Sequence, residues 1–340
     1  MPHYESEPKI NTSITTGDWR DDLFRDGFAV VKGVLSPEKA QSYKQRMFEW
    51  LETFPYGFKA SDPSTWGKDH LPENMKGGMY HGYKVQHEKV IWDARCEPAI
   101  LDVFGKLWGT DELLVSFDGM NLTLPAADMP PSEPWPHVDQ NPNRKGMQCV
   151  QGILNLAPNG PDDGGLVVVK GSHGMNETFF KLHPETKGAG TWGSLDWHGF
   201  NEQEVGWFKQ RGCEEIKVCA DPGDLILWDS RQIHYNKLPV SGNVRAVMYI
   251  CYTPASFASK EDLEKKASCF QDRIGTASIL PYRCGQRSNN LQTHWPHANI
   301  FSQVDKHIRL GKPDLYRRDR PAHEPEENKL ILKLAGVEAY

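Results

Sequence analysis

The sequence predicts a mainly β protein with flanking helices, whose strands form a sandwich or a barrel. Three observations lead to this fold class. From about residue 111 to 254 the chain consists of short apolar runs, which are separated by turn sequences such as APNGPDDGG and PVSGN. These turns are too short to hold the crossover helices of alternating βαβ units. Clear helical patterns occur only before and after this region.

The N-terminal region, at about 16–110, is predicted to be largely helical. Asp18 is a suitable cap for a short helix, and the sequence SPEKA opens a second helix with proline at its first position. The β-branched run FAVVKGVL between them predicts a strand. The sequence EPAILDVFGKLWG predicts a further helix that ends at Gly109. Residues 55–90 lack a clean period, and we expect a long irregular loop there, of a kind that is often functional.

Six runs in the central region have the β-branched and apolar content of strands. They are residues 113–124, 147–156, 164–171, 214–219, 224–229 and 244–253. The tail begins with a charged helical pattern at 259–274 and ends with a short helical pattern at 327–336. Because the helical ends need an apolar surface to cover, we expect them to pack around the strands.

We expect the whole chain, 1–340, to form a single domain. Its 340 residues and 38% hydrophobic content are sufficient for one large core. The expected parts are a helical N-terminal region at about 16–110, a strand-rich core at about 111–254 and a helical or irregular C-terminal extension at 255–340. The sequence contains no internal repeat that would divide it further.

Composition narrows the possible partners. The formal net charge of −6 gives no general attraction to nucleic acid or to an anionic membrane, so we expect neither as a partner. The start of the sequence lacks a secretory pattern, and no apolar run is long enough to span a bilayer. The seven cysteines are scattered and odd in number, with no Cys-x-x-Cys, which is typical of reduced thiols. We therefore expect a cytoplasmic protein; the sequence does not indicate its oligomeric state.

The stretch EPWPHVDQNP, residues 133–142, places a histidine and an aspartate two positions apart. On a strand, His137 and Asp139 would project from the same face and could both reach one metal ion. Taken alone, this pattern is more often an ordinary polar turn. Further ligands have to be sought elsewhere in the chain.

A second histidine and an arginine lie far downstream. His234 follows the strand candidate at 224–229, and Arg245 begins the next one. An arginine on a strand is costly to bury unless an anion receives it. Two histidines and one carboxylate on one face form the facial triad of non-haem Fe(II) oxygenases. An arginine near such a triad can bind the distal carboxylate of a dicarboxylic keto acid in a bidentate manner.

With these four residues the sequence resembles the phytanoyl-CoA hydroxylase-like family of Fe(II)- and 2-oxoglutarate-dependent dioxygenases. Supporting similarities are FRDGFAVVKGVLSPEKA, NLAPNGPDDGGLVVVKGSHG and PGDLILWDSRQIHYN, and the resemblance covers roughly 20–254. It implies a double-stranded β-helix, or cupin-like jelly roll, as the core at about 111–254. It also implies that His137, Asp139 and His234 ligate Fe(II), and that Arg245 binds the co-substrate 2-oxoglutarate.

Some secondary contacts of that family are absent from this sequence. Pro134 replaces a glutamine that several relatives use to hold the keto acid, and Leu166 replaces a threonine. Gln151 and Asn121, which are polar residues within apolar strands, are the expected substitutes. The alternative is that both are buried amides satisfied by neighbouring backbone.

Several aromatic residues are candidates for a substrate pocket. Trp135 is close to the predicted metal ligands in the sequence, and Trp192 and Trp197 lie in a predicted inserted loop. All three are expected to contact substrate, although tryptophans most often serve as core residues.

The resemblance implies an oxidoreductase that oxidises a small organic substrate, most simply by hydroxylation, with release of succinate and CO2. Dioxygen would be the second co-substrate; desaturation, ring formation and the use of a CoA thioester stay open. Two other functions also fit the residues. A zinc hydrolase could use the same two histidines and carboxylate, but it would leave Arg245 without a role. A catalytically silent jelly roll that binds a ligand would be expected to lack one of the metal ligands.

Overall fold

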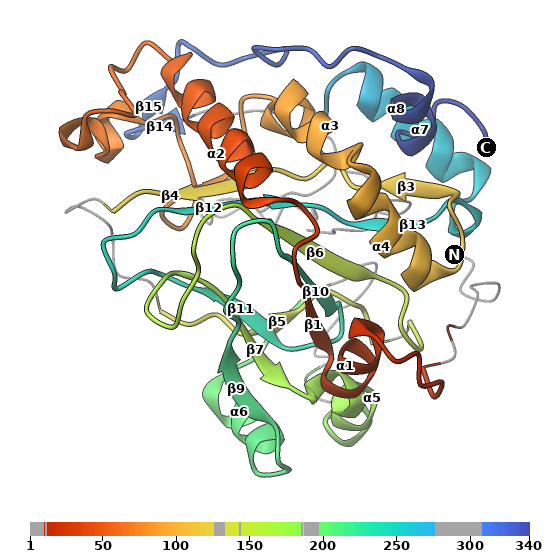
Figure 1. The fold of residues 1–340 in the computed structure, drawn as a ribbon. Coiled ribbons are helices and arrows are strands. Elements are labelled where there is room, and N and C mark those ends of the chain that lie inside the picture. The colour runs from red at the N-terminus through yellow and green to blue at the C-terminus, as the bar shows by residue number, and fades with distance from the viewer. Residues whose placement is uncertain are drawn as a thin grey trace.

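Two antiparallel sheets lie face to face at the centre of the molecule (Figure 1). The structure is a computed structural model, which describes residues 10, 12–125, 133–142, 144–184, 186, 197–275 and 308–340. In spatial order, the larger sheet consists of β1 (Phe28–Val31), β10 (Leu225–Asp229), β6 (Val150–Asn155), β12 (Arg245–Tyr249), β4 (Met120–Thr123) and β2 (Met79–Tyr80). The smaller sheet consists of β8 (His198–Gly199), β5 (His137–Val138), β11 (His234–Lys237), β7 (Gly165–Lys170) and β9 (Glu214–Lys217).

The strands of the core alternate between the two sheets on either side of an excursion. The chain passes from β4 in the larger sheet to β5 in the smaller one, then to β6 and β7. After β8 and β9, which also belong to the smaller sheet, it alternates again through β10, β11 and β12. This winding is that of a double-stranded β-helix, and it confirms the predicted mainly β jelly roll. The N-terminal region, predicted to be helical, also supplies both edge strands of the larger sheet, β1 and β2.

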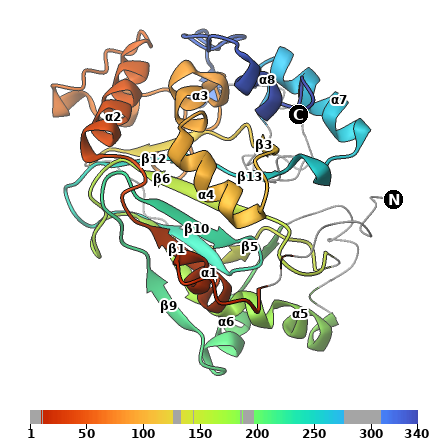
Figure 2. The same cartoon turned by 45° about the vertical axis from the view of Figure 1, so that its right-hand side comes forward.

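Eight helices described by the structure flank the sheets. They are α1 (Trp19–Asp26), α2 (Pro37–Glu52), α3 (Lys89–Arg95), α4 (Pro98–Trp108), α5 (Ser172–Leu182), α6 (Glu202–Lys209), α7 (Lys260–Gln271) and α8 (Lys329–Leu334). Figures 1 and 2 show α2, α3 and α4 on the outer side of the larger sheet, with α5 and α6 near the smaller sheet. No helix in the described ranges is both long enough and apolar enough to cross a bilayer.

The larger sheet is buried on both faces, and β10 shows how its sequence meets this requirement. Leu225 and Leu227 pack into the core beneath the helices. Ile226 and Trp228 point the other way, where they pack with Val168 and other residues between the two sheets. Because successive side chains of a strand point to opposite faces, a strand covered on both sides has to be apolar at every position. The sequence LILW meets this demand.

The predicted helix boundaries of the N-terminal region are confirmed. The Asp18 side chain accepts a hydrogen bond from the backbone N–H of Arg20, and Ser36 caps α2 through the N–H of Lys39. These bonds satisfy donors that have no partner within the helix. At the end of α4, Gly109 adopts the left-handed conformation with a φ of 70°, which a glycine tolerates without strain.

One predicted strand is divided in the structure. Residues 113–124 form β3 (Leu113–Val115), which pairs with β13 (Tyr252–Pro254), and then β4 in the larger sheet. Between the two strands, the carbonyl of Asp118 accepts a hydrogen bond of 2.8 Å from Arg95 Nη2, so this group is lost to strand pairing. The break falls at Asp118-Gly119, a dipeptide typical of turns, and a buried arginine of α3 binds the carbonyl there.

Candidate metal centre

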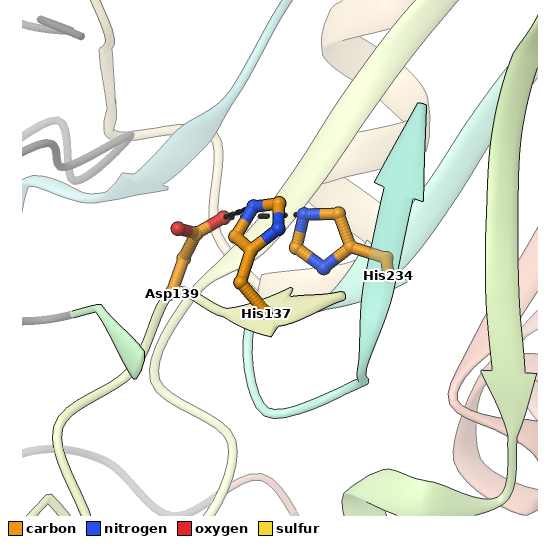
Figure 3. Close-up of side chains that lie close together, drawn as sticks. All are labelled: His137, Asp139 and His234. Atoms are coloured by element: carbon orange, nitrogen blue, oxygen red, sulfur yellow. Dashed lines mark ion pairs between the residues drawn. The ribbon is translucent and has the colours of Figure 1, made fainter. Parts of the chain in front are cut away.

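The register between two short strands brings the two predicted histidine ligands together. β5 pairs with β11, and His137 lies directly opposite His234 although 97 residues separate them in the chain. Asp139 follows β5, and its backbone N–H donates a hydrogen bond of 2.9 Å to the carbonyl of Ser230. Figure 3 shows the two imidazole rings and the carboxylate pointing toward one another from these elements.

The three side chains form a compact and buried group. Oδ2 of Asp139 lies 3.2 Å from Nε2 of His234 and 3.6 Å from Nε2 of His137. One nitrogen or oxygen of each residue lies within 4.8 Å of the others, and within the described ranges this is the cluster of three such residues able to hold a metal ion. The exposed fractions are 4%, 1% and 5% for His137, Asp139 and His234, so water competes little with a bound ion.

Hydrogen bonds fix which ring nitrogen of each histidine faces the centre. Nδ1 of His137 lies 3.0 Å from the carbonyl of Trp135, and Nδ1 of His234 lies 2.9 Å from the carbonyl of Gln232. Since a carbonyl only accepts, each Nδ1 carries a proton, and Nε2 is the ring nitrogen that faces the carboxylate. Burial, assisted by the neighbouring His234, lowers the pKa of His137 to about 3. A neutral imidazole is the form that binds metal ions.

Gln151 contacts the carboxylate of this group. It lies on β6 of the larger sheet, and its Nε2 donates a hydrogen bond of 2.8 Å to Oδ2 of Asp139. The bond therefore joins the two sheets and fixes the orientation of the carboxylate. The sequence predicted a different role for Gln151, a contact with the keto acid, and that role stays a prediction.

Arg245 projects from β12 into the space between the sheets. Its side chain is 4% exposed, and its Nε and Nη1 have no hydrogen-bond partner among the described residues. A Cβ atom added to Gly165 of β7 would lie 3.3 Å from Nε of Arg245, so glycine leaves room there for the guanidinium. A buried, incompletely paired guanidinium is costly by itself and fits an anionic ligand.

The position of Gly165 relates Arg245 to the histidines. On β11 the partner of Gly165 is Lys237, three residues beyond His234. Three residues of a strand span about 10 Å. An extended five-carbon diacid that binds at the histidines by one end has a length suited to this separation.

Asn121 lies on β4, which is the neighbour of β12. Its Oδ1 accepts a hydrogen bond of 2.9 Å from Thr123, while its Nδ2 has no partner among the described residues. Burial raises the pKa of Tyr249, and the positive charge of Arg245 acts in the opposite direction. Asn121 pairs with Val247 across β4 and β12, so it lies on the strand next to that of Arg245.

Two of the three predicted substrate-binding tryptophans lie beside the metal ligands. The ring of Trp135 stacks on His137 at a centroid distance of 4.4 Å and an interplanar angle of 8°. The ring of Trp197 lies 6.1 Å from the same imidazole and its side chain is 38% exposed, which places it near solvent. Trp192 lies outside the described residues.

The sequence analysis did not single out Lys76. Its ammonium group lies over the ring of Trp135, and burial lowers its pKa to about 7. No carboxylate of the described residues forms an ion pair with it. The signal in the sequence was the pair of glycines that follows: a Cβ at Gly78 would lie 2.6 Å from the carbonyl oxygen of Leu122, so only glycine permits this close approach to β4.

Together, fold and site define a class of protein. A double-stranded β-helix that carries two histidines and a carboxylate on adjacent strands, with an incompletely paired arginine between its sheets, is the arrangement of non-haem iron oxygenases that use 2-oxoglutarate. Comparisons with known proteins agree. The family model for phytanoyl-CoA dioxygenase (PhyH) matches residues 23–246. The chain belongs to the phytanoyl-CoA dioxygenase family and is an oxidoreductase.

Relatives of known sequence or structure extend over most of the chain. The protein is 42% identical over 288 residues to "Ava biosynthesis cluster protein O" of Aspergillus versicolor, which covers 83% of this chain and 93% of that protein. A structure of GlcNAc inducible gene 2 from Candida albicans superposes with a TM-score of 0.53 at 14% identity, covering 78% of this chain and 69% of that one. The epimerase SnoN, solved with Fe3+, alpha ketoglutarate and nogalamycin RO, gives a TM-score of 0.47 at 17% identity over 69% of this chain and 82% of its own.

Proposed function

We propose that this oxygenase hydroxylates a small organic substrate, with consumption of dioxygen and 2-oxoglutarate and release of succinate and CO2. The observation that carries the proposal is the convergence of His137, Asp139 and His234 on two paired strands. In this proposal the three residues ligate Fe(II) through two Nε2 atoms and a carboxylate oxygen. Ligands on one side of the ion leave its other positions to the co-substrate and to dioxygen.

The donor set of two imidazoles and one carboxylate agrees with ferrous iron. Both histidines direct Nε2 at the same carboxylate oxygen, which places two imidazole nitrogens and one carboxylate around a single point. When iron is bound, it supplies the activation of dioxygen and the oxidation itself. The protein holds the ion, binds the keto acid and keeps water away from the buried centre.

For 2-oxoglutarate, we assign the distal carboxylate to Arg245. Its Nε and Nη1 have no partner among the described residues, so the buried guanidinium has N–H groups left to donate to an anion. Asn121, with its free amide donor, is a candidate for an additional contact. Lys76, whose ammonium lies beside the metal ligands, provides a second positive charge for an anionic co-substrate.

For the organic substrate, we propose a pocket bordered by Trp135 and Trp197 beside His137. The name of the Aspergillus versicolor relative refers to a biosynthesis cluster, which supports a small organic molecule as the substrate. Cytoplasmic residence stays a prediction from the sequence, and fractionation of cells that produce the protein would test it.

The test of the metal ligands compares matched histidine variants. Anaerobic titration with Fe(II) should show one site in the wild-type protein, and His137→Ala or His234→Ala should weaken iron binding at least about 100-fold. His323→Ala is the control, because that side chain is 63% exposed and lies in the C-terminal segment. Succinate release in air, screened over small organic compounds, then identifies the substrate. Retention of full iron affinity by both His137→Ala and His234→Ala would refute the ligand assignment.

A further inference from the structure

The C-terminal segment 308–327 contacts the loop at 71–80, which places Lys76 beside the metal centre. This segment contains β14 (Ile308–Arg309) and β15 (Lys312–Pro313), and it lies beyond the family match, which ends at residue 246. Its contacts reach the segment 53–88, on the N-terminal side of the core. The inference below rests on the proposed function, because it assigns the segment a part in binding 2-oxoglutarate.

Asp314 is the central contact of this segment. Its carboxylate accepts hydrogen bonds of 2.6 Å from the hydroxyl of Tyr56 and 2.6 Å from the hydroxyl of Tyr83. The backbone N–H of Tyr316 donates a further bond of 2.9 Å to Oδ1. The hydroxyl of Tyr83 in turn accepts a bond of 3.0 Å from the backbone N–H of Glu73. One carboxylate in the tail is thus connected through a single tyrosine to the backbone of the loop.

Further contacts fix both ends of the segment. Arg309 donates a hydrogen bond of 2.7 Å to the carbonyl of Leu71, and its guanidinium stacks on Tyr56. At the other end, the buried carboxylate of Glu88 accepts bonds of 2.6 and 3.0 Å from the backbone N–H groups of Ala322 and His323. The segment is therefore bonded to the chain before and after the loop.

The loop itself has a conformation that needs such support. Lys76 and Tyr83 adopt positive φ angles of 47° and 57°, which cost free energy for residues other than glycine. β2 follows at once and pairs with β4, which attaches the C-terminal end of the loop to the larger sheet. This loop conformation places the Lys76 ammonium over Trp135, which lies two residues before the ligand His137.

We propose that Asp314 is a positioning residue of the metal centre: through Tyr83 it holds the loop at 71–80, so that Lys76 stays beside the site where 2-oxoglutarate binds. Asparagine at this position keeps the size but removes the charge, and its amide nitrogen cannot accept a hydrogen bond from a tyrosine hydroxyl. The loop should then lose its attachment while the sheets remain intact.

The first experiment measures hydrogen exchange of the loop in the full-length protein without ligands. Asp314→Asn should speed exchange in the 71–80 peptide by about tenfold, with no change in the peptide that contains β6. Asp319→Asn is the matched control, since Asp319 is exposed in the same segment. A second pair of variants tests which tyrosine connects Asp314 to the loop. Tyr83→Phe should speed exchange in this peptide, whereas Tyr56→Phe, which also removes a bond to Asp314, should not.

The second experiment measures 2-oxoglutarate affinity by anaerobic titration of the Fe(II) protein. Lys76→Met and Asp314→Asn should each weaken the affinity about fivefold to tenfold, because a positive charge is removed or displaced. The double variant should bind no more weakly than Lys76→Met alone, since Asp314 acts through Lys76. A purely structural role of Asp314 would not produce this lack of additivity.

Three results would overturn the proposal: unchanged exchange of the loop in Asp314→Asn, full additivity of the two substitutions, or wild-type affinity in Lys76→Met. Failure of the proposed function looks different. In that case the wild-type protein itself would not bind 2-oxoglutarate with Fe(II), while the exchange experiment would still show whether Asp314 holds the loop.

Discussion

Each histidine of the metal centre is oriented by its own segment of chain. In both cases Nδ1 donates to the carbonyl two residues earlier, Trp135 for His137 and Gln232 for His234. The same short-range contact therefore sets the tautomer at two places that are distant in the sequence. A hydrogen bond from the remote ring nitrogen to a carbonyl holds the imidazole in one orientation and raises its affinity for a metal ion.

At the residue scale, the assignment of Arg245 has a measurable consequence. Arg245→Met should raise the KM for 2-oxoglutarate about 100-fold, which corresponds to about 2.7 kcal/mol of lost binding free energy. Because the substitution removes a buried and incompletely paired charge, the apo protein should not lose stability. Kinetic titration with 2-oxoglutarate and thermal unfolding would measure the two effects.

Arg211→Met is the control for this prediction. Arg211 is exposed at the end of α6, where its Nη1 donates to the carbonyl of Trp207. The KM for 2-oxoglutarate should stay within about twofold of the wild-type value, since surface substitutions have small effects. An unchanged KM in Arg245→Met would show that the distal carboxylate binds elsewhere.

The candidate site residues could be predicted where residue type and family resemblance were enough to identify them. His137, Asp139, His234 and Arg245 were singled out by residue type, spacing and family resemblance, and the structure brings the first three together. The bond from Gln151 to Asp139 depends on how one sheet lies against the other, and Lys76 depends on the path of an irregular loop. Neither arrangement has a periodic pattern in the sequence.

At the element scale, the turn between β10 and β11 determines where His234 begins. Asp229 is 1% exposed at the end of β10, and its carboxylate accepts from the backbone N–H of Arg231 at 2.8 Å and from Nη2 of the same residue at 2.6 Å. The carbonyl of Asp229 also accepts from the N–H of Gln232. These bonds close a tight turn just before the histidine.

This turn predicts a pH dependence of stability. Burial alone would raise the pKa of Asp229, but the ion pair and hydrogen bonds with Arg231 outweigh it, and the pKa lies below its ordinary value of 3.8. A carboxyl with a lowered pKa in the folded state stabilises the protein above the unfolded value. This contribution is lost as the pH falls below about 3.8. Urea unfolding between pH 3 and 7 should show the loss in the wild-type protein.

Asp229→Asn should remove that part of the pH dependence and lower the free energy of unfolding at pH 7 by about 3 kcal/mol, because Arg231 stays largely buried without its partner. Asp162→Asn, at an exposed position in a turn, should have little effect. If the two variants unfold at the same urea concentration, the Asp229 ion pair does not stabilise the turn.

At the scale of the whole molecule, the core extends well past the family match. The largest apolar cluster includes residues from Leu23 to Ala335, and Ile331 and Leu334 of α8 are buried within it. The hydroxyl of Tyr340 donates a bond of 2.6 Å to the carbonyl of Leu113 at the start of β3. These contacts join described parts of the C-terminal extension to the core, and the single domain over 1–340 stays a prediction.

A single domain should unfold in one transition and depend on its last helix. Leu334→Ala should cost about 2–5 kcal/mol, because it leaves a cavity in the shared core. Leu330→Ala is a matched control in the same helix, where the side chain is 37% exposed, and it should cost less than about 1 kcal/mol. Urea unfolding followed by both tryptophan fluorescence and circular dichroism tests this. Two separate transitions would contradict the single domain.

Most of the architecture followed from local patterns, and its exceptions have long-range causes. The central strands and the capped helices were predicted because apolar periodicity and turn residues are encoded within each segment. The division of 113–124 into two strands was missed, although Asp118-Gly119 lies at the break, where Arg95 of α3 donates to the carbonyl of Asp118. The helices α3, α5 and α6 were also missed, since their segments lie within or beside irregular sequence.

The pairing of β5 with β11 also has a consequence for how the protein matures. A slip of one residue between these strands would turn one imidazole to the opposite face and separate the ligands. Only a correctly aligned chain can then capture the ion, and capture would stabilise that alignment over its competitors. Iron binding would therefore favour the correctly paired strands over mispaired ones while the protein folds.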